Sequence, residues 1–318
     1  MTHEGKGWLA GAAVRLLRLF FRLVNRSRRR RLAKFRLVSK SYARLAASLM
    51  PPISDEDLVE VSQNGLRMLA DGRDGSGPVA AFYWGEYEPI TTRVWQQLIG
   101  GGDVVVDVGA NWGYFTLLAA RQCGPRGSVF AFEPHPRNFA ILTRNIAANG
   151  LGNVIATQKA VSDSEGRLAL NVCPFSAGHS IRPLPAVGAM PGNNDVRLVV
   201  EATTLDSFFR DLPVQPKIVK IDVEGAEALV IAGMHKLMQR CPDLTIIAEL
   251  NPDYLGGDSA DRLLGSLFGM GFQFAVIDDD HRFLHPAAKE EVVVRITQNQ
   301  GCNLLCARDP KILKFAGL

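Results

Sequence analysis

The sequence has no uninterrupted run of about 18 apolar residues, the length that a conventional membrane-spanning helix requires. It also has only five cysteines in 318 residues, an odd number at irregular spacing. We therefore expect no disulfide framework, and we expect a reducing, cytoplasmic location. Hydrophobic residues make up 47% of the chain and charged residues 21%, proportions that exclude a disordered or collagenous protein.

Acidic residues are nearly absent from residues 1–50, where Glu4 is the single acid beside 13 lysines and arginines. The whole chain has 36 basic and 32 acidic residues, so residues 51–318 hold 23 and 31, a balance of −8. Phosphate contacts need clustered Lys and Arg. We therefore expect no nucleic-acid partner for the main domain.

Residues 1–50 are predicted to form a basic amphipathic arm, followed by a lead-in segment over 51–100 and a catalytic domain over 101–318. Five arginines of the arm fall within about 80° of one another on a helix. Leucine and phenylalanine fill much of the rest, a pattern typical of a helix lying in a membrane interface. Peripheral membrane contact through residues 8–31 is one interpretation; a targeting peptide and a solvated extension are the others. The arginines are Arg15, Arg18, Arg22, Arg26 and Arg29.

From about residue 103 the chain alternates short apolar runs with helical patterns, which predicts a doubly wound, mostly parallel α/β sheet. A less regular region is expected over 162–200, and two closing strands at the C-terminal end are expected to be antiparallel. The predicted strands are 104–108, 128–132, 154–158, 218–222, 244–250, 272–277 and 303–307. The predicted helices are 114–122, 136–149, 226–240 and 259–270.

A glycine-rich turn follows the first of these strands and carries the most informative motif. Gly109 and Gly113 allow a tight turn and close approach of a ligand. Glu133 ends the next strand, where a carboxylate can accept hydrogen bonds from both hydroxyls of a ribose. A dinucleotide fingerprint would carry a third glycine and leave room for a pyrophosphate. Asp107 would repel that pyrophosphate but suits a cationic, phosphate-free ligand, which favours S-adenosylmethionine (SAM) over NAD.

Three stretches resemble the FkbM family of class I SAM-dependent methyltransferases, with a Rossmann-like fold. They are Val106–Phe115, Phe132–Pro134 and Val219–Glu227. Shorter blocks at Gly85–Pro89, Thr204–Asp206 and Ala248–Leu250 are similar to flanking regions of the family, so that the resemblance covers roughly residues 80–310. Trp112 departs from the smaller aliphatic residue often found there.

The resemblance implies specific cofactor contacts as well as a reaction, the transfer of the SAM methyl group, usually to a hydroxyl oxygen. Glu133 would hold the ribose hydroxyls, and Ser162 and Asp163 would lie near the adenine. The residues implied on the methionine side are Asp107, Gly109, Asn111 and Gly113.

An alcohol is a poor nucleophile, so we expect the acceptor oxygen to require a general base. Asp222 ends the fourth strand beside Glu224, and either carboxylate is a candidate base or a group that orients the cofactor. His179, in the irregular region, is a third candidate because its ordinary pKa lies near neutrality. Asp222, Glu249 and Asn251 would also make an oxygen set for Mg²⁺; a metal is considered but not expected.

We therefore expect a SAM-dependent methyltransferase that methylates a hydroxyl of a small molecule or glycan. Two alternatives stay open on the sequence alone. One is an NAD(P)-dependent oxidoreductase, and the other is a catalytically silent Rossmann-like binding module.

Overall fold

The structure, a computed structural model, describes residues 58–71, 87–173, 176–182, 196–255 and 257–313. The predicted basic arm and its membrane contacts over residues 8–31 lie outside these residues. The chain divides into two compact units, 1–87 and 88–318. None of the described helices is long and apolar enough to cross a membrane.

The described part of the first unit is one antiparallel hairpin of β1 (Leu58–Gln63) and β2 (Leu66–Asp71). Asn64 and Gly65 form its two-residue turn, with φ of 50° and 73°. Positive φ at both positions is typical of the turns that match the twist of a hairpin, and Asn-Gly is the preferred pair for them.

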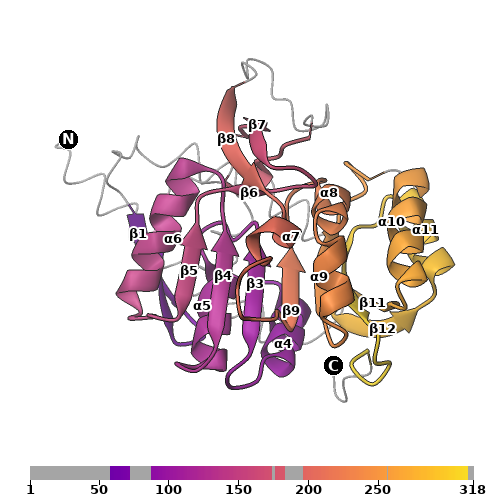
Figure 1. Cartoon of the computed structure of the whole chain (residues 1–318), viewed down its shortest axis with the longest axis horizontal. Helices are drawn as coiled ribbons and strands as arrows, with labels where there is room; N and C mark the ends of the chain where they lie inside the picture. Colours follow the sequence, from indigo (N-terminus) through magenta and orange to yellow (C-terminus); the bar gives the residue numbers. More distant parts are fainter. Residues whose placement is uncertain (1–57, 72–86, 174–175, 183–195, 256, 314–318) are drawn as a thin grey trace, which may run out of the picture. The chain divides into compact units, whose positions relative to one another are not determined.

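The second unit is built on an eight-stranded sheet in the order β12-β11-β13-β10-β9-β3-β4-β5 (Figure 1). The five strands from β10 to β5 are parallel, and β13 runs antiparallel to both of its neighbours. The doubly wound, mostly parallel sheet with an antiparallel C-terminal strand is thus confirmed. The strands are β3 (Val104–Val108), β4 (Ser128–Phe132), β5 (Val154–Thr157), β9 (Ile218–Ile221), β10 (Thr245–Leu250), β11 (Gln273–Asp278), β12 (Phe283–Ala287) and β13 (Cys302–Ala307).

Alternation along the parallel strands divides the core between the two faces of the sheet. Val106 and Val108 of β3 pack with α7 (Leu205–Phe208), α8 (Glu227–Ala232), α9 (His235–Arg240) and α10 (Gly257–Gly269). Figure 1 shows α7 and α9 in front of the sheet. On the other face Ala131 of β4 packs with α6 (Pro136–Ala148), and α5 (Tyr114–Cys123) contacts β3 and β4.

The predicted irregular region contains a second, three-stranded sheet. Its order is β6-β8-β7, formed by β6 (Ala160–Val161), β7 (Gly166–Asn171) and β8 (Arg197–Thr203). Much of β7 and β8 is exposed, and only short apolar patches such as Leu170 and Val200 are buried. The hydrophobic pattern that marks a buried strand is therefore weak there, which explains why the region reads as irregular.

The helix predicted over 226–240 is two helices, because the chain bends at Gly233 between α8 and α9. A Cβ atom at Gly233 would lie 2.0 Å from the carbonyl oxygen of Ser162, so only glycine fits this approach. The amides of Lys236 and Leu237 in the new helix donate to the carboxylate of Asp206, at 3.0 and 2.7 Å. β12, whose fourth residue is Pro286, and α11 (Lys289–Thr297) are not among the elements predicted from the sequence.

Helix α4 (Pro89–Leu98) lies within the predicted lead-in segment 51–100 and belongs to the second unit. The Trp95 indole donates to the carbonyl of Phe115 in α5 at 3.1 Å. The helix has no cap from its own N-cap side chain. Asp279, in the β11–β12 turn, instead accepts from the amides of Ile90 and Thr91 at 2.6 and 3.1 Å. This carboxylate joins the start of the second unit to its C-terminal third.

Replacing Asp279 with alanine should lower the free energy of unfolding by about 1–2 kcal/mol, since two helix-terminal amides lose their acceptor. Urea denaturation of the full chain measures the effect. The neighbouring Asp280 is exposed, and Asp280→Ala is the matched control, with a change below about 0.5 kcal/mol expected. Equal effects of the two substitutions would contradict the capping role.

Candidate active site

The glycine turn after β3 lies against the end of β9. Gly109 has a φ of 82°, and a Cβ atom on it would stand 1.8 Å from the carbonyl oxygen of Asp222. Gly113 has a φ of 97°, and its Cβ would stand 2.6 Å from Leu142 of α6. Both positions therefore require glycine. Asn111 between them adopts a φ of 49°, which is uncommon for a side chain other than glycine.

Glu133 follows β4 and binds the backbone of the glycine turn. Its carboxylate accepts from the amides of Asn111 and His135, both at 2.9 Å. The side chain is buried, and burial raises its pKa to about 7 although the two amides oppose the shift. The predicted group of Gly109, Asn111 and Glu133 is therefore assembled at one edge of the sheet.

Two buried polar atoms beside this turn have no hydrogen-bond partner among the described residues. They are Oδ1 of Asn111 and Nδ1 of His135. Buried polar atoms are nearly always paired in folded proteins, so these two call for a partner that the described residues do not supply, such as a polar group of a ligand. Together with the carboxylate of Glu133, they fit a ligand that carries hydroxyl and amino groups, as SAM does.

Asp107 is buried under the turn, on the face of β3 that α5 covers. The Thr116 hydroxyl of α5 donates to its carboxylate at 2.5 Å. Burial raises the pKa of Asp107, while the nearby ammonium of Lys220 opposes the shift. The structure thus shows Asp107 as an anchor between β3, α5 and β9; its contact with the methionine end of SAM stays a prediction.

An ion pair stands at the end of β9, where the buried ammonium of Lys220 lies 2.6 Å from the carboxylate of Asp222, whose side chain is 22% exposed. Lys220 also lies 4.4 Å above the ring of Phe115. Burial alone would lower the pKa of Lys220, but Asp222, Glu88 and Asp107 hold it above its usual range. Burial alone would raise the pKa of Asp222, but Lys220 keeps it below its usual range.

Asp222, Glu224 and Glu249 bring carboxylate oxygens within 4.8 Å of one another. The charge of Asp222 and then burial raise the pKa of Glu249 well above its usual range, which favours a protonated Glu249 that donates a hydrogen bond to Asp222. Burial, with Asp222 and Glu227 beyond it, raises the pKa of Glu224 to about 8. The oxygen spacing also suits a divalent cation. The Asn251 oxygen of the predicted Mg²⁺ set already accepts from the amide of Asp253 at 3.0 Å.

Two successive residues of the loop between β9 and α8 adopt a positive φ, 50° at Glu224 and 93° at Gly225. Glu227, buried at the start of α8, accepts from the amides of Gly225 and Val223 at 3.0 and 3.3 Å. A Cβ atom at Gly225 would stand 2.4 Å from Tyr254, so the following loop packs directly on this turn. The loop amides therefore bind Glu227, whereas Asp222 is engaged by Lys220 and Glu249.

Glu88 is a residue that the sequence analysis did not assign to the site. It is the N-cap of α4, at a φ of 41°, and its carboxylate accepts from the Asn303 amide of β13 at 3.3 Å. Its charge acts on both Lys220 and Glu249. A glutamate beside a proline before a helix gives no signal of this placement, which depends on how α4 docks against the sheet.

His179 does not offer the chemistry of a general base in this structure. Its Nδ1 accepts from the amide of Cys173 at 3.0 Å, and its ring stacks on His135 with centroids 4.1 Å apart. Burial lowers its pKa to about 3, with a smaller contribution from His135. With Nδ1 accepting from the Cys173 amide, the proton of the neutral ring stands on Nε2, so neither nitrogen is free to take a proton from a substrate. The geometry disfavours catalysis by His179, and its ring instead covers His135.

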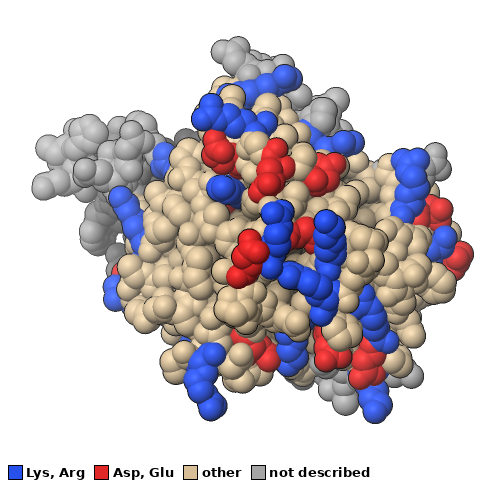
Figure 2. Space-filling model, viewed as in Figure 1, with Lys and Arg blue, Asp and Glu red and all other residues tan. Residues whose placement is uncertain are grey.

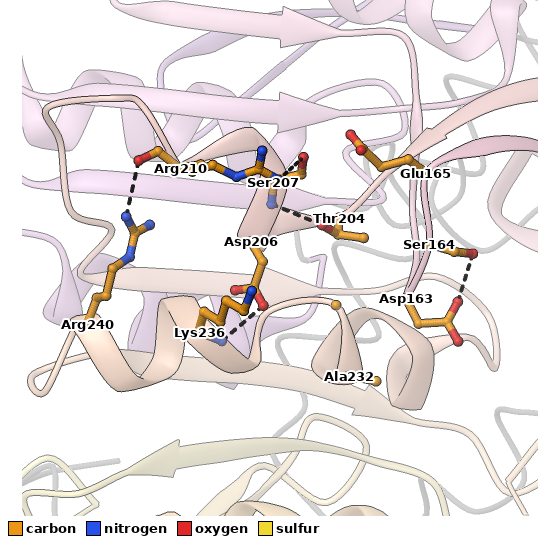
Figure 3. A pocket seen from close by; sticks show the side chains of 11 residues that line it. Asp163, Ser164, Glu165, Thr204, Asp206, Ser207, Arg210, Ala232, Lys236 and Arg240 are labelled. Atoms are coloured by element: carbon orange, nitrogen blue, oxygen red, sulfur yellow. Dashed lines mark hydrogen bonds between the residues drawn. The ribbon is translucent and has the colours of Figure 1, made fainter.

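Ser162 forms hydrogen bonds with β8 and with Asp163. The Ser162 amide donates to the carbonyl of Thr203 at 2.9 Å, and its hydroxyl donates to Asp163 at 3.2 Å. Asp163 lines a cleft of about 510 Å³ bounded by α7 and α9 (Figure 3). Arg210 and Lys236 lie on the opposite side of this cleft, within a region where Figure 2 shows basic side chains gathered. The predicted adenine contacts of Ser162 and Asp163 stay predictions.

Residues 107–274 match the model of the methyltransferase FkbM domain. The chain belongs to the FkbM methyltransferase family. The fold is accordingly the Rossmann-like class I methyltransferase fold that the sequence resemblance implies.

Curated relatives of this FkbM-family chain are named as methyltransferases. Methyltransferase 1 of Beauveria bassiana is 30% identical over 146 residues, which cover 41% of this chain and 57% of the relative. The hexuronic acid methyltransferase AglP of Haloferax volcanii is 30% identical over 138 residues, 43% of this chain and 52% of the relative. The chain thus matches little more than half the length of these relatives.

A solved structure of methyltransferase FkbM from Methylobacillus flagellatus KT aligns with 71% of this chain and 52% of its own. The sequence identity is 12% and the TM-score is 0.39.

Replacing Lys220 with methionine should lower the free energy of unfolding by about 3–5 kcal/mol, because Asp222 and Asp107 would lose their buried counter-charge. Lys217→Met is the control. The ammonium of Lys217 lies 2.9 Å from the carboxylate of Asp103, but the lysine side chain is 49% exposed. A change below about 1 kcal/mol is expected there. Urea denaturation at pH 7 compares the two; similar losses would contradict a special role for the Lys220–Asp222 pair.

Proposed function

We propose that this FkbM-family chain is a SAM-dependent methyltransferase that methylates a hydroxyl oxygen of a small molecule or glycan. The observation that carries the proposal is the assembly of a glycine turn, a carboxylate that can bind a ribose and an acidic cluster at one edge of the sheet. Gly109 belongs to the turn, Glu133 provides the carboxylate, and Asp222 belongs to the acidic cluster. The family membership and the names of the curated relatives support it.

The described residues fit SAM at this edge. The positive charges of its sulfonium and ammonium suit a site whose carboxylates outnumber its single buried lysine, Lys220. Glu133 would accept from the ribose hydroxyls, and the unpaired Oδ1 of Asn111 would accept from a donor on the cofactor. When bound, SAM supplies an electrophilic methyl group that needs no further activation.

The task left to the protein is to place the acceptor oxygen and manage its proton. Asp222 is ionised at neutral pH, because Lys220 keeps its pKa low, and it can accept the hydroxyl proton. Glu224 and Glu249 hold their protons more tightly and can donate hydrogen bonds to the acceptor or to Asp222. This arrangement keeps one negative charge beside Lys220 where three ionised carboxylates would repel one another.

The name of AglP makes sugar derivatives the first acceptors to test. A hexuronic acid offers two kinds of oxygen, its ring hydroxyls and its carboxylate. A methyl ether formed at a hydroxyl survives mild alkali, whereas a methyl ester is hydrolysed. Methyl transfer from labelled SAM to glucuronic acid and glucose, followed by alkali, therefore separates the two outcomes.

The cofactor is tested by calorimetry of the full chain with SAM and with NAD. Binding of SAM alone is expected, and Glu133→Ala should weaken it by about 1–3 kcal/mol, through the loss of charged hydrogen bonds to the ribose. Glu201→Ala, at an exposed carboxylate of β8, is the control and should leave the affinity unchanged. NAD binding would favour the oxidoreductase alternative, and binding of neither compound would favour a silent module.

The proposed proton acceptor is tested by Asp222→Asn. Loss of general-base catalysis should reduce kcat by about 10²–10⁴-fold, while affinity for SAM falls much less. The labelled-SAM assay gives kcat with the acceptor that the sugar assay selects, and calorimetry gives the affinity. An equal loss in both quantities would assign Asp222 to cofactor binding instead.

A further inference from the structure

A short segment outside the main sheet crosses the edge where the candidate site lies. Residues 176–182, here called the strap, begin with the 3₁₀ turn η2 (Ser176–Gly178). At its first end the Asn138 amide of α6 donates to the carbonyl of Ser176 at 3.1 Å. The ring of His179 then stacks on His135, two residues after Glu133. The strap thus begins over the side of the site proposed for the cofactor.

Its other end contacts the loop that carries Glu224. The Ser180 hydroxyl is buried and donates to the carbonyl oxygen of Glu224 at 2.6 Å, and it accepts from the Arg182 amide at 3.0 Å. Ser180 is itself fixed to β7. The amide of Asn171 donates to its carbonyl at 2.8 Å, the Asn171 side chain adds a second bond at 3.1 Å, and the Ser180 amide donates back at 3.2 Å.

The backbone of Glu224 needs such support, because a φ of 50° is unfavourable for a residue other than glycine. A conformation of this kind persists only where neighbours impose it. Glu227 binds the amides on either side of Glu224, and Tyr254 packs on Gly225. Among the described residues, Ser180 binds the carbonyl of Glu224 itself. The direction of the Glu224 side chain follows from this backbone.

The Glu224 carboxyl group faces a crowded set of charges and dipoles. The Asn251 amide donates to it at 3.5 Å. Burial, Asp222 and Glu227 raise its pKa to about 8, and Lys220 opposes them. If the loop relaxed outward, the carboxyl group would gain water and move away from Asp222 and Asn251.

We propose that Ser180 is a positioning residue for methyl transfer, which holds the Glu224 carboxyl group in the acceptor side of the site through the Glu224 carbonyl oxygen. The inference rests on the proposed function for its consequence in catalysis, but the geometry can be tested without any acceptor. The proposal also assigns a role to the three-stranded sheet, because its strand β7 holds Ser180 in place.

The test follows hydrogen exchange of the backbone amides of residues 223–227 in the full chain by mass spectrometry. In the wild type the amides of Val223 and Gly225 donate to Glu227 and should exchange slowly. In Ser180→Ala the exchange should be about tenfold faster or more, because the Glu224 carbonyl loses its donor and the turn relaxes. Asn171→Ala, which loosens Ser180 from β7, should accelerate the exchange by less.

Thr143→Ala is the matched control, since the Thr143 hydroxyl also donates to a backbone carbonyl, that of Ala140 at 2.9 Å, on the exposed surface of α6. It should leave the exchange of residues 223–227 unchanged. Ser180→Thr keeps the hydroxyl and should retain exchange near the wild-type rate. Unchanged exchange in folded Ser180→Ala, or an equal acceleration in Thr143→Ala, would overturn the proposal.

A catalytic readout then separates this inference from the proposed function. With the acceptor from the labelled-SAM assay, Ser180→Ala should lower kcat about tenfold or more while SAM affinity stays within about twofold of the wild type. If no acceptor is methylated by the wild type, the proposed function fails while the hydrogen-exchange result still stands. If transfer occurs but Ser180→Ala keeps the wild-type kcat, the positioning role fails alone.

Discussion

The ion pair of Lys220 and Asp222 is the interaction on which the arrangement of the site depends. Lys220 lies on the face of β9 that α5 covers, and the two-residue repeat of a strand brings Asp222 to the same face one step further on. A lone ammonium or carboxylate at this depth would be very costly. Asp107 from β3, Glu249 from β10 and Glu88 from α4 all act on this lysine or on its partner. One positive charge therefore organises acidic groups from four elements.

The same pair explains why neighbouring carboxyl groups behave differently. Asp222 has the lysine at 2.6 Å and keeps its negative charge. Glu249 meets that negative charge and retains its proton, and Glu224, further along the chain, also holds its proton above neutral pH. The fold thus places one ionised and two protonated carboxyl groups together. Such a separation of proton affinities is common where acid–base chemistry takes place.

Local features of the site could be predicted from the sequence, and contacts between distant segments could not. The strand ending in Asp107, the turn at Gly109 and Gly113, and Glu133 after the next strand lie within one βαβ unit, so their proximity follows from the pattern. Glu88 and Asn303 are 215 residues apart, and their hydrogen bond depends on the docking of α4 and the register of β13. His179 reads as a plausible base, but its stacking on His135 is a tertiary contact that no spacing reveals.

The edge strand β12 also limits whether a further strand can be added to the sheet. β12 pairs with β11 on one side, and its fourth residue is Pro286. Proline has no amide hydrogen, and within sheets it is tolerated where that missing donor points away from the neighbouring strand. An incoming β-strand would therefore meet a gap in the row of donors along β12. This border discourages edge-to-edge self-association, so the sheet can keep a long hydrophobic interior without recruiting further copies along that side.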